Sequence, residues 1–299
     1  MVPLSSVLKN TGLVHGYLTY HSDRRDPVEF LRLWRKIRRW KPDVLIYLAE
    51  PRGPFSAWRD AFLFKLCGVK QLAGVPYTKD LRENQWLADE RRHEHEARRL
   101  LRCLGGEDEV QLEDSKNWDL RLTAHEEAKA AKALANWEGR ESFFVSSVAA
   151  KVREKDWSYG NWSRLFSRLS QIHSKLGLVL VGAESEKEYS QQAAKDWKVS
   201  FLNLCGRLSV RETAAVMKRA LFYLGHDSGP MHLAAAAGIP CVAIFVECKR
   251  PGVWFPYGSG HRVIYRETNG RNPAPTPVTV DEVLKVTQEM AGEKLHAPA

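Results

Sequence analysis

A polar string interrupts two apolar segments in the stretch LFYLGHDSGPMHLAAAAGIPCVAIF, which covers residues 221–245. A hydrophobic core does not require polar residues such as Asp227, Ser228 and His232 at that place. A binding site at the end of a strand could require them. Ser228 is a natural N-cap for a following helix, and Gly229 lets a ligand approach the backbone closely. The free amides of that helix would hold an anion, with His232 facing it from the first turn. The pattern predicts a phosphate site.

An ordinary helix cap explains part of this string. Asp-Ser before a helix is a common cap, and a single histidine on a first turn is most often solvated. The complete pattern is more specific, because it reads Gly-x-Asp-Ser-Gly-Pro-x-His-x-Ala-x-Ala-x-Gly-x-Pro and continues into an apolar strand. A cap alone does not require that pattern, so a binding function is the better interpretation.

Strands and helices alternate regularly in the second half of the chain. The expected strands are FFVSSVAA, LVLVGA, VSFLNLCG, LFYLGH and CVAIF, with helices between them. This alternation is typical of an α/β fold, in which a parallel sheet is covered by helices on both faces. Ligands of such sheets bind beyond the carboxyl ends of the strands, which is where the polar string lies. Capping boxes are expected at Thr123 with Glu126 and at Ser209 with Glu212.

The first half of the chain is less regular. The expected elements are a helix from Pro27 to about Trp40, a strand over 43–49, a helix over 55–68, a strand at VKQLAGVP and a long polar helix over roughly 82–103. The acidic stretch over 105–119 is poor in apolar residues and is typical of a surface connection.

The 299-residue chain carries a net charge of +9, which favours an acidic partner. Nucleic acid, an anionic membrane face or a phosphorylated substrate would each fit. Basic residues gather in RLWRKIRRWK (32–41) and in RRHEHEARRLLR (91–102). No helix-turn-helix, zinc or aromatic-stacking signature accompanies them, which weighs against nucleic acid.

The cysteine content and the hydropathy of the chain indicate the cellular compartment in which the protein is expected. No apolar run approaches the ~18 residues of a membrane span. The 5 cysteines are an odd number and form no Cys-x-x-Cys pair, which weighs against a disulfide framework or a zinc site. We therefore expect a cytoplasmic protein.

The complete string resembles the donor-binding signature of glycosyltransferase family 9, the bacterial heptosyltransferases. Three further segments are similar to that family: SVAAKVREKDWSYGNWSRL (147–165), VLVGAESEKE (179–188) and CGRLSVRETAAVMKRA (205–220). The resemblance is strong from 143 to 265 and looser before that range.

The resemblance implies a set of donor-binding residues. Lys155, which precedes Trp157, matches the lysine that reaches the donor diphosphate. Glu186 matches the glutamate that holds the ribose, with Glu184 as the alternative. The rest of the implied set is Asp227, Ser228, Gly229 and His232.

The resemblance also implies a glycosyltransferase B architecture of two Rossmann-like domains. Residues 1–138 would form the acceptor-side domain, and residues 139–299 would form the donor domain. The last helix of the donor domain could pack against the first domain. The implied reaction transfers a sugar, typically heptose from ADP-heptose, onto the lipopolysaccharide inner core with inversion. The implied partners are an ADP-sugar and an anionic lipopolysaccharide-type acceptor at the inner membrane face, with no cofactor and no nucleic acid.

The chain lacks Asp-x-Asp, the carboxylate pair with which many nucleotide-sugar transferases hold Mg²⁺ or Mn²⁺. Lys155 and the helix terminus at 228–232 can neutralise a leaving diphosphate without a metal. We therefore expect metal-independent chemistry and no metal site.

One feature departs from the family. Its members begin with an apolar strand and a Gly-Asp turn, whose aspartate is the expected general base. No Gly-Asp follows an apolar strand in the first fifty residues here, so about two β-α units are expected to be missing and the first domain to be truncated. Asp23 and Asp26 are nearby carboxylates, but HSDRRDP is typical of a helix-capping turn, and no catalytic residue is assigned.

Three alternatives stay open. The first is a nucleotide-sugar-binding protein that has lost its general base, and the second is a nucleotide-sugar epimerase of the same fold. The third, a nucleic-acid binder, rests on charge alone.

Overall fold

The computed structural model describes residues 5–19, 27–50, 53, 55–106, 109–150, 155–267 and 277–296. The chain divides into two compact units. The larger unit comprises Met1–Leu13 and Ser115–Ala299, and the smaller unit comprises Val14–Asp114.

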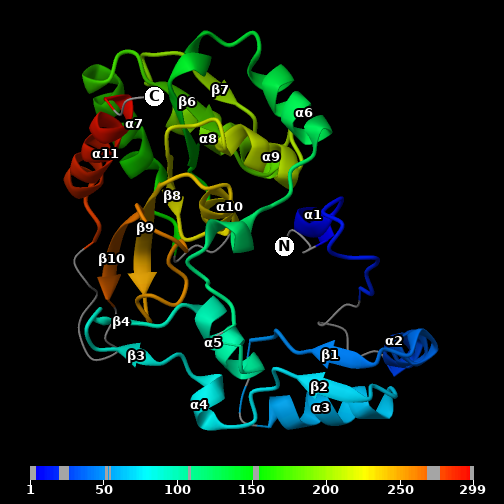
Figure 1. Cartoon of the computed structure of the whole chain (residues 1–299). Helices are drawn as coiled ribbons and strands as arrows, with labels where there is room; N and C mark the ends of the chain where they lie inside the picture. Colours follow the sequence, from blue (N-terminus) through cyan, green and yellow to red (C-terminus); the bar gives the residue numbers. More distant parts are fainter. Residues whose placement is uncertain are drawn as a thin grey trace. The chain divides into compact units, whose positions relative to one another are not determined.

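A six-stranded parallel sheet forms the centre of the larger unit, counted over the described residues (Figure 1). Its strands are β5 (Phe143–Ser147), β6 (Gly177–Leu180), β7 (Phe201–Asn203), β8 (Tyr223–His226), β9 (Cys241–Cys248) and β10 (Arg262–Glu267). Their order across the sheet is β10-β9-β8-β5-β6-β7. The chain therefore moves outward from β5 in one direction and from β8 in the other, as in the doubly wound Rossmann fold. The point where the order reverses lies between β5 and β8.

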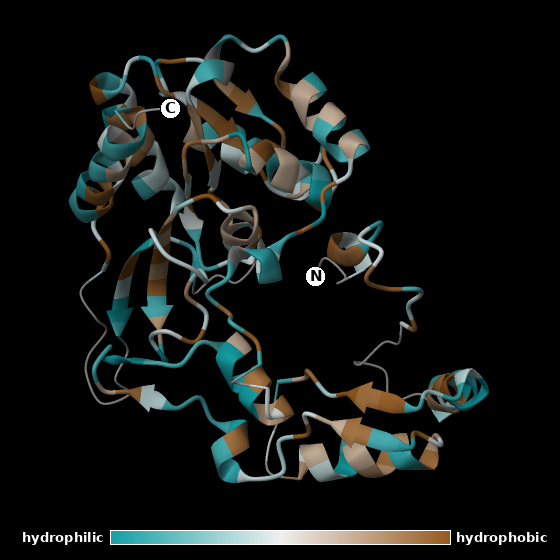
Figure 2. Cartoon of the chain, in the orientation of Figure 1, coloured by the Kyte–Doolittle hydropathy of each residue, from teal (hydrophilic) through white to brown (hydrophobic). Residues whose placement is uncertain are grey.

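Helices cover both faces of this sheet, as the alternating pattern predicts. One face packs against α7 (Tyr159–Ile172), α8 (Lys187–Ala193) and α11 (Val280–Leu295). The other packs against α6 (Ala124–Leu134), α9 (Val210–Met217) and α10 (Gly229–Ala236). Helices α6 and α11 mix hydrophobic and hydrophilic residues along their length, as expected for helices with one face on a sheet and one in solvent (Figure 2).

Local sequence signals fix several of these helix ends. The capping boxes predicted at Thr123 with Glu126 and at Ser209 with Glu212 are both present. Helix α7 ends at Ile172, and Gly177 begins β6 rather than ending a helix.

Over its described residues, the smaller unit has a two-stranded parallel sheet of β1 (Val44–Ile46) and β2 (Gln71–Ala73). Helix α3 (Ser56–Leu66) packs on one face of it through Ala57 and Ala61, which contact Tyr47. Helix α2 (Pro27–Trp40) packs through Ile37. Phe30 and Trp40 of α2 are 48% and 66% exposed, so only part of the apolar surface of this helix is buried.

The long helix predicted over 82–103 is wrong. The structure instead has α4 (Lys79–Arg82), an antiparallel pair of β3 (Trp86–Leu87) and β4 (Arg92–His93), and α5 (Glu96–Leu104). Arg91 adopts a positive φ of 51°, which a helix does not allow. The Glu94 carboxylate accepts the N–H of Gln85, and the His95 side chain caps α5. These local side-chain bonds compete with a continuous helix.

Candidate functional site

The point where the strand order reverses brings together two charged residues from different strand ends. Lys155 follows β5 and Asp227 follows β8, and the Lys155 Nζ donates to Asp227 Oδ2 over 2.5 Å. The Lys155 side chain is 41% exposed and that of Asp227 is 13% exposed. Ligands of doubly wound sheets bind in the crevice at this position. The pair therefore lies where the sequence pattern places a ligand.

Ser228 stands at the N-cap position of α10 with an extended backbone, as predicted. Its hydroxyl donates to the carbonyl of His226 over 3.3 Å instead of capping the helix. The next residues are Gly229 and Pro230, and Pro230 has no N–H. The positive end of α10 therefore receives no cap from the Ser228 side chain, which suits an anion from outside the chain.

His232 lies on the first turn of α10 beside this pair of charges. Burial lowers the pKa of His232, while the charge of Asp227 raises it and that of Lys155 lowers it. The His232 ring is 6.3 Å from that of Trp254, which is 41% exposed. Lys155, Asp227 and His232 thus lie within electrostatic reach of one another. Sequence reasoning missed Trp254, since nothing in its local pattern marks it.

Glu186 occupies a neighbouring strand end, after β6. Its Oε2 accepts the N–H of Ala183 over 2.8 Å, so the half-buried carboxylate turns back against the end of the strand. A Cβ on Gly182 would lie 2.3 Å from that oxygen, so glycine is needed for this close approach. Glu184, the alternative, is exposed and pairs with Lys187 over 3.7 Å. The donor-binding roles of the six residues named from the sequence stay predictions.

Tyr223 adds a buried hydroxyl that sequence reasoning missed. Burial raises the pKa of this hydroxyl, and the nearby Ser147 and Ser228 hydroxyls offset that effect only in part. Among the described residues the hydroxyl makes no hydrogen bond of ordinary geometry. It is therefore a neutral donor beneath the end of β8, beside the N-terminus of α10. Only the folded sheet shows this, because the buried strand pattern hides the role of a single tyrosine.

Gly225 allows the Tyr223 ring to lie against its backbone, two residues along the same strand. A Cβ at Gly225 would meet the Tyr223 hydroxyl oxygen at 2.2 Å. We expect Gly225→Ala to lower the free energy of unfolding by about 1–3 kcal/mol, as other overpacked cores do. Denaturant unfolding measures this. Gly229→Ala is the matched control, since nothing lies within 4 Å of its added Cβ. Equal stability of the two variants would contradict the close packing of Tyr223 on Gly225.

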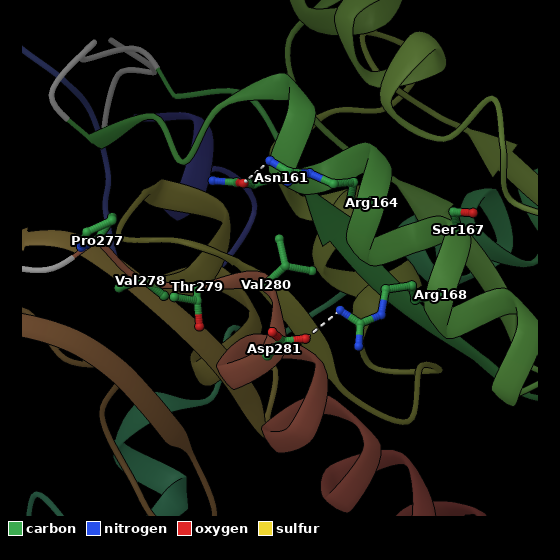
Figure 3. Close-up of a pocket in the computed structure, with 9 residues that line it drawn as sticks. All are labelled: Asn161, Arg164, Ser167, Arg168, Pro277, Val278, Thr279, Val280 and Asp281. Carbon is green, nitrogen blue, oxygen red and sulfur yellow. Dashed lines mark hydrogen bonds and ion pairs between the residues drawn. The ribbon is translucent and has the colours of Figure 1, made fainter.

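A cavity of about 460 Å³ lies between α7 and the start of α11 (Figure 3). Arg164, Arg168 and Asp281 line it, and the Arg168 guanidinium donates to Asp281 over 2.6 Å. None of the donor-binding residues predicted from the sequence lines this cavity. We therefore base no function on it.

The described part of the chain has neither a candidate metal cluster nor a helix that could span a membrane. No group of three or more His, Cys, Asp or Glu side chains there could hold a metal ion. Metal-independent chemistry stays a prediction. No helix among the described residues is both long and apolar enough to cross a membrane. Asp23 and Asp26 lie outside the described residues.

Comparison with solved structures shows the fold. A glycosyltransferase family 9 protein from Veillonella parvula superimposes with a TM-score of 0.71 at 16% identity, over 97% of this chain and 86% of that one. The E. coli ADP-heptose lipopolysaccharide heptosyltransferase II gives a TM-score of 0.61 at 16% identity, over 90% and 82% of the two chains. The E. coli heptosyltransferase WaaC with ADP gives 0.56 at 18% identity, over 88% and 77%. The predicted glycosyltransferase B fold is confirmed.

Comparison of sequences shows the family. Residues 30–278 match glycosyltransferase family 9 (heptosyltransferase), and the chain belongs to that family. The lipopolysaccharide core heptosyltransferase OpsX of Haemophilus influenzae is 21% identical over 219 residues, which are 72% of this chain. The match spans 60% of the length of OpsX.

Proposed function

We propose that this protein transfers a sugar, heptose from ADP-heptose, onto the lipopolysaccharide inner core. The observation that carries the proposal is the convergence of Lys155, Asp227 and His232 at the uncapped N-terminus of α10. A cation and a helix N-terminus at one crevice suit a diphosphate. Family membership and the solved complex of WaaC with ADP support ADP as the nucleotide.

The chemistry follows from where charge develops. An acceptor hydroxyl attacks the anomeric carbon and gives its proton to a general base, for which no residue is assigned. The bond from that carbon to the diphosphate oxygen breaks, and ADP leaves with the electron pair. The Lys155 ammonium has three N–H donors, so it can keep one on Asp227 and offer the others to phosphate oxygens. Together with the α10 dipole it stabilises the negative charge on the leaving diphosphate. Attack opposite the leaving group inverts the anomeric carbon.

Exposed basic residues support an anionic acceptor. Helix α2 exposes Arg32, Arg35, Lys36 and Arg39 to solvent, and it also exposes Phe30 and Trp40. Basic residues interspersed with exposed aromatic ones favour contact with the surface of an anionic membrane. This combination supports a peripheral position at the inner membrane face, where the acceptor would lie.

Replacing residues of the crevice tests the proposal. We expect Asp227→Ala and His232→Ala to reduce donor binding or transfer while the fold stays intact, because both side chains lie at the crevice. Calorimetry with ADP, a transfer assay with ADP-heptose and thermal unfolding measure the effects. Asp281→Ala is the control, since Asp281 also pairs with a cation but lines the separate cavity. A large drop in Tm with no effect on ligand would show that the residue only caps the helix.

Incubation with ADP-heptose and a core acceptor separates the alternatives. Transfer to the acceptor supports the proposal. Binding without turnover would identify a nucleotide-sugar-binding protein that has lost its general base. A changed free nucleotide-sugar would identify an epimerase instead.

A further inference from the structure

The segment that carries Lys155 ends in a strained turn. Ser158, which precedes α7, has a φ of +77°, a conformation that is strained for a residue other than glycine. Its N–H binds Asp156 Oδ1 over 3.0 Å, and the Asn161 amide binds the Trp157 carbonyl over 2.6 Å. Such a turn persists only where neighbouring structure holds it in place.

Trp157 is the residue through which this segment is held. Its side chain is buried at 3% exposure and its indole N–H donates to the carbonyl of Val278 over 2.8 Å. Its backbone N–H donates to Nε2 of His226 over 3.0 Å. Trp157 follows Lys155 by two residues, so a fixed Trp157 backbone limits where Lys155 can lie.

His226 is suited to accept this hydrogen bond. The side chain is fully buried and its ring lies edge-on to that of Trp162 at 5.1 Å. Burial lowers the pKa of His226 to about 4, against a smaller opposing effect of Asp156. The ring is therefore neutral near pH 7, with its proton on Nδ1 because Nε2 accepts. Among the described residues Nδ1 has no hydrogen-bond partner, so the bond to Trp157 is the one polar contact that places the ring.

The residue that follows β8 completes the arrangement. Asp227 follows His226 and holds the Lys155 side chain, while His226 holds the backbone two residues further on. We propose that His226 is a positioning residue, which keeps Lys155 in the crevice by binding the Trp157 backbone. The proposal rests on the proposed donor site. A lysine placed in advance loses less freedom when the diphosphate binds, which favours tighter binding.

Two substitutions distinguish the role of His226 as a hydrogen-bond acceptor from the packing of its aromatic ring. His226→Phe keeps an aromatic ring against Trp162 but leaves the Trp157 N–H without its acceptor. His226→Gln places a side-chain oxygen near the position of Nε2 and should restore the bond. His226→Leu replaces the Phe variant if thermal unfolding shows that the Phe variant does not fold.

The first measurement is amide hydrogen exchange at Trp157 in the protein without ligand, which does not depend on the donor site. We expect exchange in His226→Phe to be at least about tenfold faster than in the wild type, and exchange in His226→Gln to stay slow. Equally slow exchange in all three proteins would overturn the inference.

The second measurement is ADP affinity in a double-mutant cycle with Lys155→Ala. We expect His226→Phe to weaken ADP binding about tenfold when Lys155 is present and to have no effect in Lys155→Ala, since the two residues act together. The Gln variant should bind within about threefold of the wild type. Equal losses in both backgrounds would show a merely structural role and overturn the inference. If the wild type itself does not bind ADP, the proposed function fails, and the exchange measurement still decides whether His226 holds the segment.

Discussion

Lys155→Ala is expected to weaken ADP binding by about 1.5–3 kcal/mol, which is roughly a tenfold to 150-fold increase in Kd. In the proposed donor site the Lys155 ammonium makes a charge-assisted contact with the diphosphate, and alanine cannot replace that contact. Adenosine has no phosphate and should bind both forms equally. Calorimetry with ADP and adenosine measures the two affinities.

Lys218→Ala is the matched control for this substitution. Lys218 also pairs with a carboxylate, Glu127, over 3.5 Å, but it lies at the C-terminal end of α9, away from the crevice. Its loss should leave ADP affinity unchanged. Unchanged ADP affinity in Lys155→Ala would refute the role of Lys155 at the diphosphate.

The proposed donor site can largely be predicted from the sequence, because its residues follow strand ends. The alternation after residue 143 predicts a parallel sheet, and carboxyl ends of parallel strands meet at one edge. Asp227 comes directly after a buried strand and His232 lies on the first turn of the helix that follows, so their place at that edge follows from the pattern. The structure adds the contact between Asp227 and Lys155, which are 72 residues apart.

The bonds that support the crevice are not visible in the sequence. His226 and Tyr223 lie within a short apolar strand. The two-residue repeat of a strand predicts only that its side chains alternate between the two faces of the sheet. Their neighbours come from segments far apart, such as Trp157, which is 69 residues from His226. Burial of each side chain then depends on packing of the whole sheet, which no local pattern encodes.

The region over 82–103 shows a second limit. Its residues are good helix formers, and propensity alone predicts one helix. Glu94 instead accepts the N–H of Gln85 and pairs with Arg102 over 2.5 Å at 2% exposure. The hydrogen bonds of this buried carboxylate stabilise the observed structure by more than the helix propensity of the segment, which amounts to a few tenths of a kcal/mol per residue.

Arg211→Met is expected to lower the free energy of unfolding by about 3–5 kcal/mol, the cost of breaking a buried ion pair by removing one partner. Arg211 is 3% exposed and donates to both carboxylate oxygens of Glu126, over 2.6 and 2.9 Å. It also donates to the carbonyls of Val7 and Leu120, so it connects α9 to α6, to α1 (Ser5–Leu8) and to the segment before α6. Methionine fills similar space but leaves Glu126 charged and without these donors.

Denaturant unfolding of three variants tests this expectation. Arg168→Met is the control, because Arg168 pairs with Asp281 at 47% exposure and such surface pairs contribute about 0–1 kcal/mol. The double variant Arg211→Met, Glu126→Leu should recover part of the loss, since no buried charge then stays unpaired.

Burial alone raises the pKa of Glu126, but the bonds from Arg211 and Thr123 outweigh it and hold that pKa below its usual value. The wild type should therefore lose stability as the pH falls below about 4.5, the usual value, and Arg211→Met should lose less over that range. A cost below about 1 kcal/mol for Arg211→Met, equal to that of the control, would show that this buried pair does not hold α6 and α9 together.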